Sequence, residues 1–292
     1  MSLHLTITPT DGKGTEGIGS VVYYHILLNI LCEYLGVKYT FPGFTNLAHH
    51  SYTGYSNEEW SDSFTTFFNF PNLKNLDAYV KGSQLDSQFF SLLEEYKNTD
   101  KEIIVDLYYG NTSIMNYCES KKDEIFTKER IDRVRKNLVF SGKKYFGEGI
   151  NICHHIRSGN PNDIPGELAA PHREIYNPER DYPRFKNLIS TLKNKYVDEN
   201  VTYHIHSQGT YEGFVNLLGL ATEKFSIVLH LNDHPTSDLY HMSNCDLLVM
   251  ANSSFSLIAS LMNSNPSIVR DNFWHFTYSN AIKTDYNYNV KL

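Results

Sequence analysis

The sequence has few cysteines and lacks the motifs of several enzyme classes. Its four cysteines are widely spaced and form neither a C-x-x-C pair nor a Cys/His zinc pattern, so we expect reduced, buried thiols. It contains no G-x-S-x-G nucleophile elbow and no H-E-x-x-H zinc motif, which argues against the hydrolases that those motifs define. D-x-D, the pair of carboxylates that would hold a divalent metal on a nucleotide diphosphate, is also missing. We therefore expect no metal and no cofactor.

Long apolar runs and basic clusters are missing too. No stretch reaches about 18 consecutive apolar residues, and the first residues lack the charged start, apolar run and cleavage site of a signal peptide. We therefore expect no membrane span and a cytoplasmic location. The formal net charge is −7 and the sequence has no Lys/Arg-rich face, which argues against nucleic acid as the main partner.

What the sequence does contain is a regular alternation in its second half. Strands are expected at residues 150–156, 201–206, 226–231, 247–251 and 267–269, and helices at 184–196, 211–218, 236–243 and 255–262. Strands and helices that alternate at this length predict an α/β fold with a parallel, doubly wound sheet and right-handed crossovers.

The first half begins in the same style. The expected elements are a strand at residues 3–8, a Gly-rich loop, a helix at 20–35, a strand at 37–41, an irregular aromatic region with a helix near 87–96, a strand at 103–107 and a largely helical stretch at 112–140. Two glycines in Lys143–Gly149 mark a domain boundary. We expect an N-terminal domain, residues 1–147, and a C-terminal domain, residues 148–292, whose last residues can pack back on the first domain.

The Gly-rich loop raises one alternative. Gly12, Gly14 and Gly17 satisfy G-x-G-x-x-G, the pattern of an NAD(P)-dependent oxidoreductase. In that fold the second strand ends in an acidic residue that holds a ribose hydroxyl, whereas here it ends in Thr40 and Phe41. The loop has no Gly-Lys-Ser/Thr either, so it is no Walker P-loop.

Three strand ends in the second half carry polar residues. They are NICHHIRSGN (Asn151–Asn160), HSQG (His206–Gly209) and ANSSFS (Ala251–Ser256), and the third also begins a helix. The carboxyl ends of parallel strands lie on one rim of the sheet, where α/β proteins bind their ligands. Arg157 is always charged, so we expect an anion site in which a diphosphate is neutralised by Arg157, the helix dipole and hydroxyls.

These segments resemble the GDP-fucose-dependent fucosyltransferases, most closely the α-1,2-fucosyltransferases, relatives of the α-1,6 and protein O-fucosyltransferases. His155–Asn160 is similar to the family's H-x-R-R-G-D motif. Met242–Asp246 and Ala251–Ser256 are similar to its M-S-x-C-x and A-N-S-S-F-S signature, and Gly17–Ser20 resembles its G-L-G-N-Q loop.

The resemblance implies a GT-B fold, in which two Rossmann-like domains face each other across a cleft, with the nucleotide sugar in the C-terminal domain. It implies an inverting, metal-independent glycosyltransferase that moves fucose, or a related sugar, from a GDP-sugar to a glycan hydroxyl. Arg157 would stabilise the diphosphate leaving group. The other donor-binding residues would be Gly17, Gly19, Ser20, His155, Ser207, Gln208, Asn252, Ser253, Ser254, Phe255 and Ser256.

Three departures from the family pattern leave alternatives open. Ser158 replaces the second Arg, Asn160 replaces the Asp, and Ser20-Val21 replaces Asn-Gln in the N-terminal loop. Another GDP-sugar remains an alternative to GDP-fucose, and a catalytically lost glycan- or nucleotide-binding module of the same fold remains an alternative to the enzyme. The sequence does not name the general base that an inverting transfer needs. The candidates are Asp11, Glu16, His49, His50, Glu167 and His172.

Overall fold

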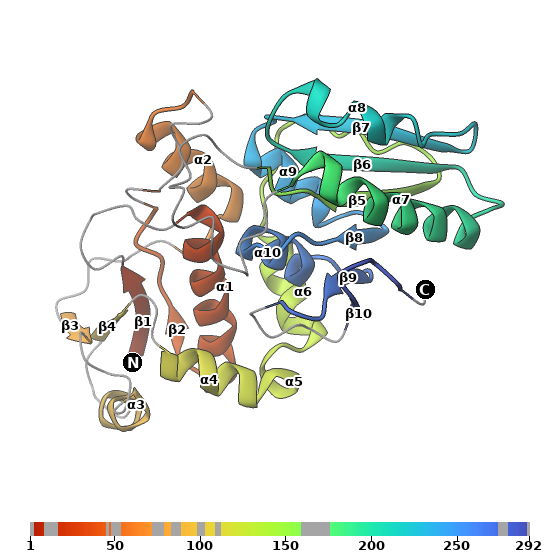
Figure 1. Ribbon diagram of the computed structural model, residues 1–292. Coiled ribbons are helices and arrows are strands. Elements are labelled where there is room, and N and C mark those ends of the chain that lie inside the picture. The colour runs from red at the N-terminus through yellow and green to blue at the C-terminus, as the bar shows by residue number, and fades with distance from the viewer. Residues whose placement is uncertain are drawn as a thin grey trace. The chain divides into compact units, whose positions relative to one another are not determined.

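The chain divides into two compact units, Met1–Val139 and Phe140–Leu292, each with a parallel β-sheet (Figure 1). This computed structural model describes residues 3–8, 17–44, 47, 54–71, 79–82, 89–97, 103–108, 112–158, 176–273 and 280–290. The α/β fold class with two Rossmann-like units, which is the composition of a GT-B protein, is confirmed. That the two units face each other across a cleft stays a prediction.

The first unit contains a four-stranded parallel sheet in the order β2-β1-β4-β3. Its strands are β1 (Leu3–Thr8), β2 (Lys38–Tyr39), β3 (Tyr79–Gly82) and β4 (Ile103–Tyr108). Strand β3 lies in the region that the sequence analysis treats as irregular. It is short and ends in glycine, so it lacks the alternating apolar pattern by which a strand is recognised.

Helix α1 (Ile18–Leu35) follows in the first unit. It ends at Gly36, whose φ of +70° is the left-handed conformation that favours glycine. Among the helices that the structure describes, α1 is the one long and apolar enough to cross a membrane. Of its most apolar 18-residue window, 67% is buried inside the protein, which is the pattern of a core helix, so the helix does not show a membrane span.

Helix α2 (Asn57–Phe68) corrects the expectation of irregular structure after residue 42. It begins with a capping box, in which the Ser56 N–H donates to Glu59 Oε2 at 2.8 Å and the Glu59 N–H donates to Ser56 Oγ at 3.2 Å. Its Trp60 and Phe64 side chains are buried. A Ser-x-x-Glu pair ahead of an aromatic run is the sequence signal that predicts this helix.

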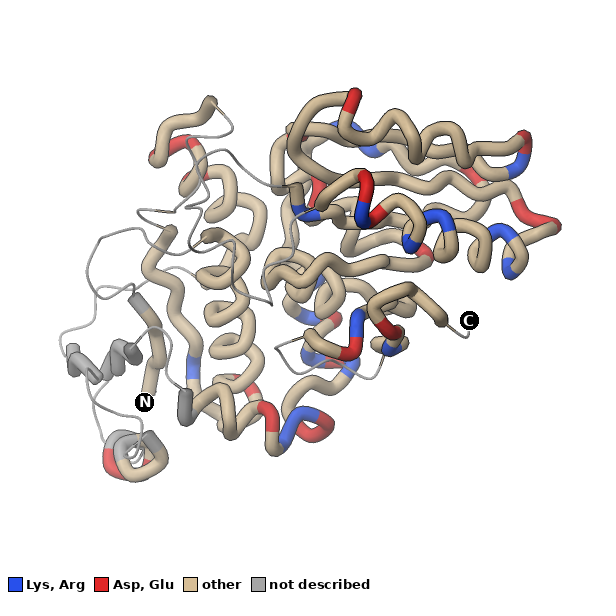
Figure 2. The backbone as a smooth tube through the Cα atoms, viewed as in Figure 1, with Lys and Arg blue, Asp and Glu red and all other residues tan. Residues whose placement is uncertain are grey.

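The stretch expected to be largely helical at residues 112–140 forms three separate helices. They are α4 (Thr112–Ser120), α5 (Lys122–Ile125) and α6 (Lys128–Lys136), and α3 (Phe89–Lys97) precedes them. Helix α6 buries Val134 alone and carries mixed acidic and basic residues, as expected for a solvated face (Figure 2).

The second unit contains a six-stranded, fully parallel sheet in the order β10-β9-β8-β5-β6-β7. Its strands are β5 (Ile150–His155), β6 (Val201–Ser207), β7 (Phe225–Leu231), β8 (Leu247–Val249), β9 (Ser267–Arg270) and β10 (Ala281–Thr284). From β5 the chain adds β6 and β7 on one side, then returns to add β8, β9 and β10 on the other. This is the strand order of dinucleotide-binding folds, so the predicted doubly wound sheet is confirmed. Strand β10 was not expected.

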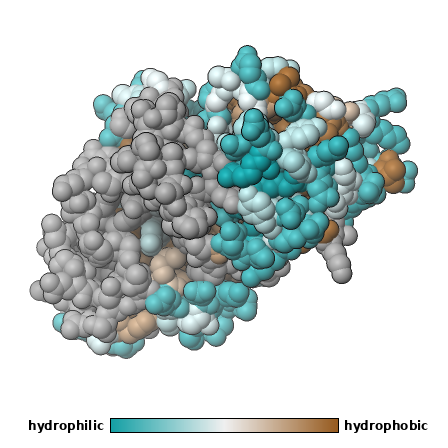
Figure 3. Space-filling model, in the orientation of Figure 1, coloured by the Kyte–Doolittle hydropathy of each residue, from teal (hydrophilic) through white to brown (hydrophobic). Residues whose placement is uncertain are grey.

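Helices cover both faces of this second sheet. They are α7 (Pro178–Lys195), α8 (Val215–Leu218), α9 (Pro235–Met242) and α10 (Ser254–Met262). On one face, Phe185 and Leu188 of α7 share an apolar core with Ile152 and Tyr203. The expected helix at residues 211–218 is a 3₁₀ turn, Tyr211–Gly213, followed by the short α8. The surface in view in Figure 3 is mainly hydrophilic where it is described.

Residues 140–147 belong to the second unit, although the two glycines place the boundary after residue 147. The reason is aromatic packing on α9. The Phe140 ring stacks on Tyr240 with centroids 4.1 Å apart, and the Tyr145 ring stacks on His241 at 3.4 Å. Stacked rings of this kind hold the segment to α9 before β5 begins.

A buried ion pair holds the first turns of α7. Asp181 is fully buried and accepts hydrogen bonds from Arg180 Nε at 2.6 Å and from Arg184 Nη2 at 2.8 Å. Arg184 is the buried partner, and Arg184→Ala leaves the fully buried Asp181 with only the more exposed Arg180 as its cation, so we expect a loss of about 3 kcal/mol in the free energy of unfolding. Arg180 is 44% exposed, and Arg180→Ala should cost about 1 kcal/mol or less. Urea denaturation measures both losses, and equal losses would contradict this account.

Candidate functional site

The second sheet reverses its winding direction between β5 and β8. Neighbouring strands at such a switch point send their connections to opposite faces, which leaves a crevice beyond their carboxyl ends where α/β proteins bind ligands. Arg157 follows β5 at this point, and Ala251–Ser256 follows β8. The structure therefore brings together all three polar strand ends selected from the sequence, two of them at the switch point itself. The third, His206–Gly209, follows β6, which pairs with β5.

Hydrogen bonds fix the backbone around Arg157. The Ile156 N–H donates to the His206 carbonyl at 3.0 Å, and the Ile156 carbonyl accepts from Ser207 Oγ at 2.7 Å. The Arg157 carbonyl accepts from the Tyr176 N–H at 2.8 Å. The Arg157 side chain is half-buried. A guanidinium on a backbone held at three points is well placed to act as a preorganised cation.

The start of α10 offers hydrogen-bond donors at the same rim. Ser253 is the N-cap, and its Oγ accepts from the Phe255 N–H at 3.2 Å. Asn252 is 3% exposed, and its Nδ2 is buried with no hydrogen-bond partner among the described residues. An unpaired buried donor is costly, and at a helix N-terminus it points to an anionic or oxygen-bearing ligand. Ser254 and Phe255 are half-buried in the first turn of α10.

A short hydrogen-bond chain joins β5 to α10. His155 Nδ1 lies 2.5 Å from Ser256 Oγ, and the Ala251 N–H donates to the same oxygen at 3.1 Å. Burial lowers the pKa of His155 to about 3, with the nearby His206 and Arg157 acting in the same direction. His155 is therefore neutral throughout the physiological range. Its ring lies 5.5 Å from that of Phe255, centroid to centroid.

The turns after β6 and β7 are locked together beside Ser158. The Asn232 side chain makes two hydrogen bonds to Gly209. Its Oδ1 accepts from the Gly209 N–H at 3.1 Å, and its Nδ2 donates to the Gly209 carbonyl at 2.9 Å. Gly209 has a φ of +121°, and a Cβ there would lie 3.3 Å from Ser158 Oγ. The positive φ therefore favours glycine, and a Cβ would also make a tight contact with the Ser158 hydroxyl. The neighbouring Gln208 is exposed on this rim.

Two predicted donor-contacting hydroxyls have partners inside the fold. Ser207 Oγ donates to Ile156, as above, and is 6% exposed, while the fully buried Ser256 Oγ contacts His155 and Ala251. The N-terminal loop residues Gly17, Gly19 and Ser20 lie at the start of α1, in the first unit. The six base candidates lie outside the described residues: Asp11, Glu16, His49, His50, Glu167 and His172.

Sequence reasoning missed a cluster of histidines under α9. It comprises His204 and His206 of β6, His230 of β7 and His241 of α9, together with Tyr145 and Asp238. His206 Nδ1 lies 2.7 Å from Asp238 Oδ1, and His204 Nδ1 lies 3.0 Å from His230 Nε2. Within the described part of the chain, no group of three or more His, Cys, Asp or Glu side chains could hold a metal ion. Histidines two apart on one strand are the signal that they share a face.

Comparison with known proteins adds a likeness in fold at low sequence identity. No family model matches the sequence, and no curated protein matches it. Among solved structures, a variant of FUT1 from Arabidopsis thaliana in complex with GDP is 10% identical, with a TM-score of 0.48, 91% of this chain and 69% of that chain covered. POFUT1 in complex with GDP-fucose is 12% identical, with a TM-score of 0.44 and coverages of 91% and 96%. The E. coli heptosyltransferase WaaC with ADP-2-deoxy-2-fluoro heptose is 10% identical, with a TM-score of 0.45 and coverages of 97% and 92%.

Proposed function

We propose that this protein is a glycosyltransferase of GT-B type that moves fucose, or a related sugar, from a GDP-sugar to a glycan hydroxyl, with inversion and without a metal. The observation that carries the proposal is the buried Nδ2 of Asn252, which has no hydrogen-bond partner in the part of the chain that the structure describes. Asn252 lies at the N-terminus of α10, at the carboxyl ends of β5 and β8, where Arg157 also lies. The sequence resemblance to GDP-fucose-dependent enzymes selects the same two segments independently.

The site residues have distinct roles in this proposal. Arg157 neutralises the charge that grows on the β-phosphate as the sugar–phosphate bond breaks, a role that a planar, permanently charged guanidinium suits. The α10 dipole and the Asn252 amide add donors to the same diphosphate. Together they replace the divalent metal that a D-x-D site would have held, since the sequence contains no such pair.

The acceptor side belongs to the first unit in this proposal. There the base would take the proton of the acceptor hydroxyl as the oxygen attacks the anomeric carbon from the side opposite the departing GDP. We place the protein in the cytoplasm, acting on a soluble or lipid-linked glycan.

Binding of GDP tests the metal-free donor site. With EDTA present, GDP at 100 times its dissociation constant should add about 2.7 kcal/mol to the apparent stability, read as a thermal shift. Asn252→Ala should weaken GDP binding about tenfold, because it removes one buried donor worth about 1–3 kcal/mol. A GDP-induced thermal shift that EDTA abolishes would contradict the metal-free model, and a larger shift with NAD would favour the oxidoreductase.

Hydrolysis of the donor distinguishes the enzyme from a pure binding module. A transferase releases some free sugar from the GDP-sugar to water, whereas a binding module releases none.

A further inference from the structure

The Ser256 hydroxyl is enclosed between two partners. It is fully buried, and within the described part of the structure its oxygen contacts His155 Nδ1 at 2.5 Å and the Ala251 N–H at 3.1 Å. A hydroxyl carries one hydrogen to donate and two lone pairs that accept. The Ala251 N–H uses one lone pair, so the remaining question is which way the proton points between Ser256 and His155.

The hydroxyl proton has one acceptor within reach. If His155 Nδ1–H donated to Ser256 Oγ, the Ser256 hydrogen would be left buried with no acceptor among the described residues, at a cost of about 1–3 kcal/mol. If Ser256 donates to Nδ1 instead, the hydroxyl hydrogen and the Nδ1 lone pair are both satisfied. A neutral imidazole that accepts at Nδ1 carries its proton on Nε2.

The surroundings of His155 keep the ring neutral. His155 is the last residue of β5, its ring contacts the Phe255 ring, His206 is paired to it in register on β6, and Arg157 lies two residues on. Burial, His206 and Arg157 all disfavour a second proton. The Nε2 atom has no hydrogen-bond partner among the described residues, and the side chain is only half-buried.

We infer that Ser256 fixes His155 as a neutral imidazole with its proton on Nε2, and that this N–H donates a hydrogen bond to a diphosphate oxygen of the nucleotide sugar. The second half of this inference rests on the proposed function. Ser256 is then a positioning residue that acts through His155, rather than a contact of the donor. His155 cannot be the general base, because Nδ1 is occupied and Nε2 already carries a proton.

Nitrogen-15 NMR of the ligand-free protein with labelled histidine tests the tautomer. His155→Gln removes one imidazole signal and so assigns it. We expect Nε2 of His155 to be protonated and Nδ1 to be an unprotonated acceptor from pH 8 to pH 5. Ser256→Ala, checked for an unchanged fold by its circular dichroism, should give a mixture of both tautomers. A wild-type His155 with its proton on Nδ1, or a charged ring at pH 6, would overturn the inference.

Affinity for GDP tests the donated hydrogen bond. The glutamine amide nitrogen can reach the place of Nε2, whereas asparagine reaches only the place of Nδ1. We expect His155→Gln to bind GDP within about threefold of wild type and His155→Asn to lose about tenfold, the equivalent of 1.4 kcal/mol. Equal affinities in both variants would overturn the contact with the diphosphate. If the wild type bound no GDP, both the proposed donor and this contact would be wrong. The NMR measurement would still decide the tautomer of His155 independently.

Discussion

Arg157→Lys should lower turnover about 10²-fold or more, and Arg157→Ala should lower it further. The departing β-phosphate gains negative charge in the transition state, so a fixed guanidinium acts more strongly there than on the ground-state donor. Lysine keeps the charge but loses the planar fork that binds two oxygens at once. The fold should survive both changes, because the side chain is half-buried at a strand end and outside the apolar core.

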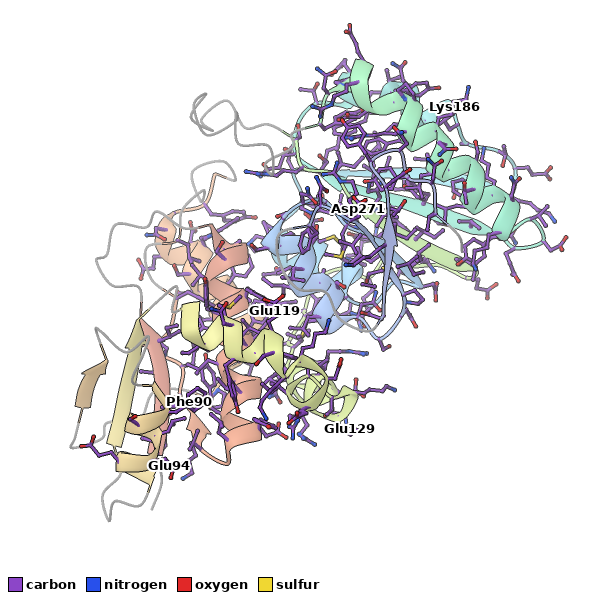
Figure 4. The ribbon with its side chains drawn as sticks, turned by 60° about the horizontal axis from the view of Figure 1, so that its bottom comes forward. Phe90, Glu94, Glu119, Glu129, Lys186 and Asp271 are labelled. Carbon is purple, nitrogen blue, oxygen red and sulfur yellow. The ribbon has the colours of Figure 1, made fainter. Side chains whose placement is uncertain are left out.

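Lys186→Ala is the matched control for the loss of a cation. Lys186 is exposed on α7 of the same unit, and its side chain lies among those at the outer surface of that helix (Figure 4). We expect its turnover to match that of the wild type. Arg184 is unsuitable, because its pairing with Asp181 makes it a stability residue. Near-normal sugar transfer by a correctly folded Arg157→Ala protein would contradict the role of Arg157 and favour the binding module.

Mild acid should destabilise the second unit strongly. Five of its histidines are buried: His154, His204, His206, His230 and His241. Burial lowers the pKa of His204 and His206 to about 3 and that of His230 and His241 to about 4, and it holds the pKa of His154 well below the usual range. Charges on neighbouring histidines act in the same direction. The folded unit therefore excludes protons that the unfolded chain binds.

The sign and size of this effect follow from proton linkage. An unfolded histidine takes up its proton near pH 6.5, so this stability is fully present above that pH and is lost as the pH falls toward 4. Each buried histidine contributes up to about 1.4 kcal/mol per pH unit. Asp238 acts in the opposite direction, because burial and the nearby Asp233 raise the pKa of its carboxyl group. Because His155, whose pKa is also lowered to about 3, adds to the five, the net loss between pH 6 and pH 5 should be about 6 kcal/mol, comparable to the whole stability of many domains.

Urea denaturation at pH 7, 6, 5.5 and 5 measures this loss. This pH range lies above that in which ordinary carboxylates titrate, so the change in stability across it comes mainly from the histidines. His230→Gln should remove about one proton from the linkage and lower the slope by about 1.4 kcal/mol per pH unit. A stability at pH 5 within about 1 kcal/mol of that at pH 7 would show that the histidine cluster accepts protons while folded.

The second unit was predictable because its strands are short apolar runs between helical stretches. Strands β5 to β9 lie within a few residues of the expected positions, and their alternation with helices gave the doubly wound order. The aromatic region of the first unit was harder. Helix α2 has a polar, aromatic composition, and its capping box at Ser56 and Glu59 is the signal to weigh there. Strand β10 depends on pairing with β9 and has little pattern of its own.

The site was predictable only as far as strand ends reveal it. Arg157 and the start of α10 could be selected because the carboxyl ends of parallel strands share a rim. The partners of individual hydroxyls could not, since Ser256 meets His155 through a contact between residues far apart in the chain. The stacking of Tyr145 on His230 and His241 is long-range in the same way. It explains why the second unit begins at Phe140 rather than after residue 147.

A crystal structure of the protein with GDP, grown in EDTA, tests the central claim most directly. The account predicts the diphosphate at the rim between β5 and β8, with its oxygens within hydrogen-bond distance of the Arg157 guanidinium and of Asn252 Nδ2, and with no metal beside it. GDP bound away from this rim, or at it with Asn252 Nδ2 still unpaired, would contradict the account.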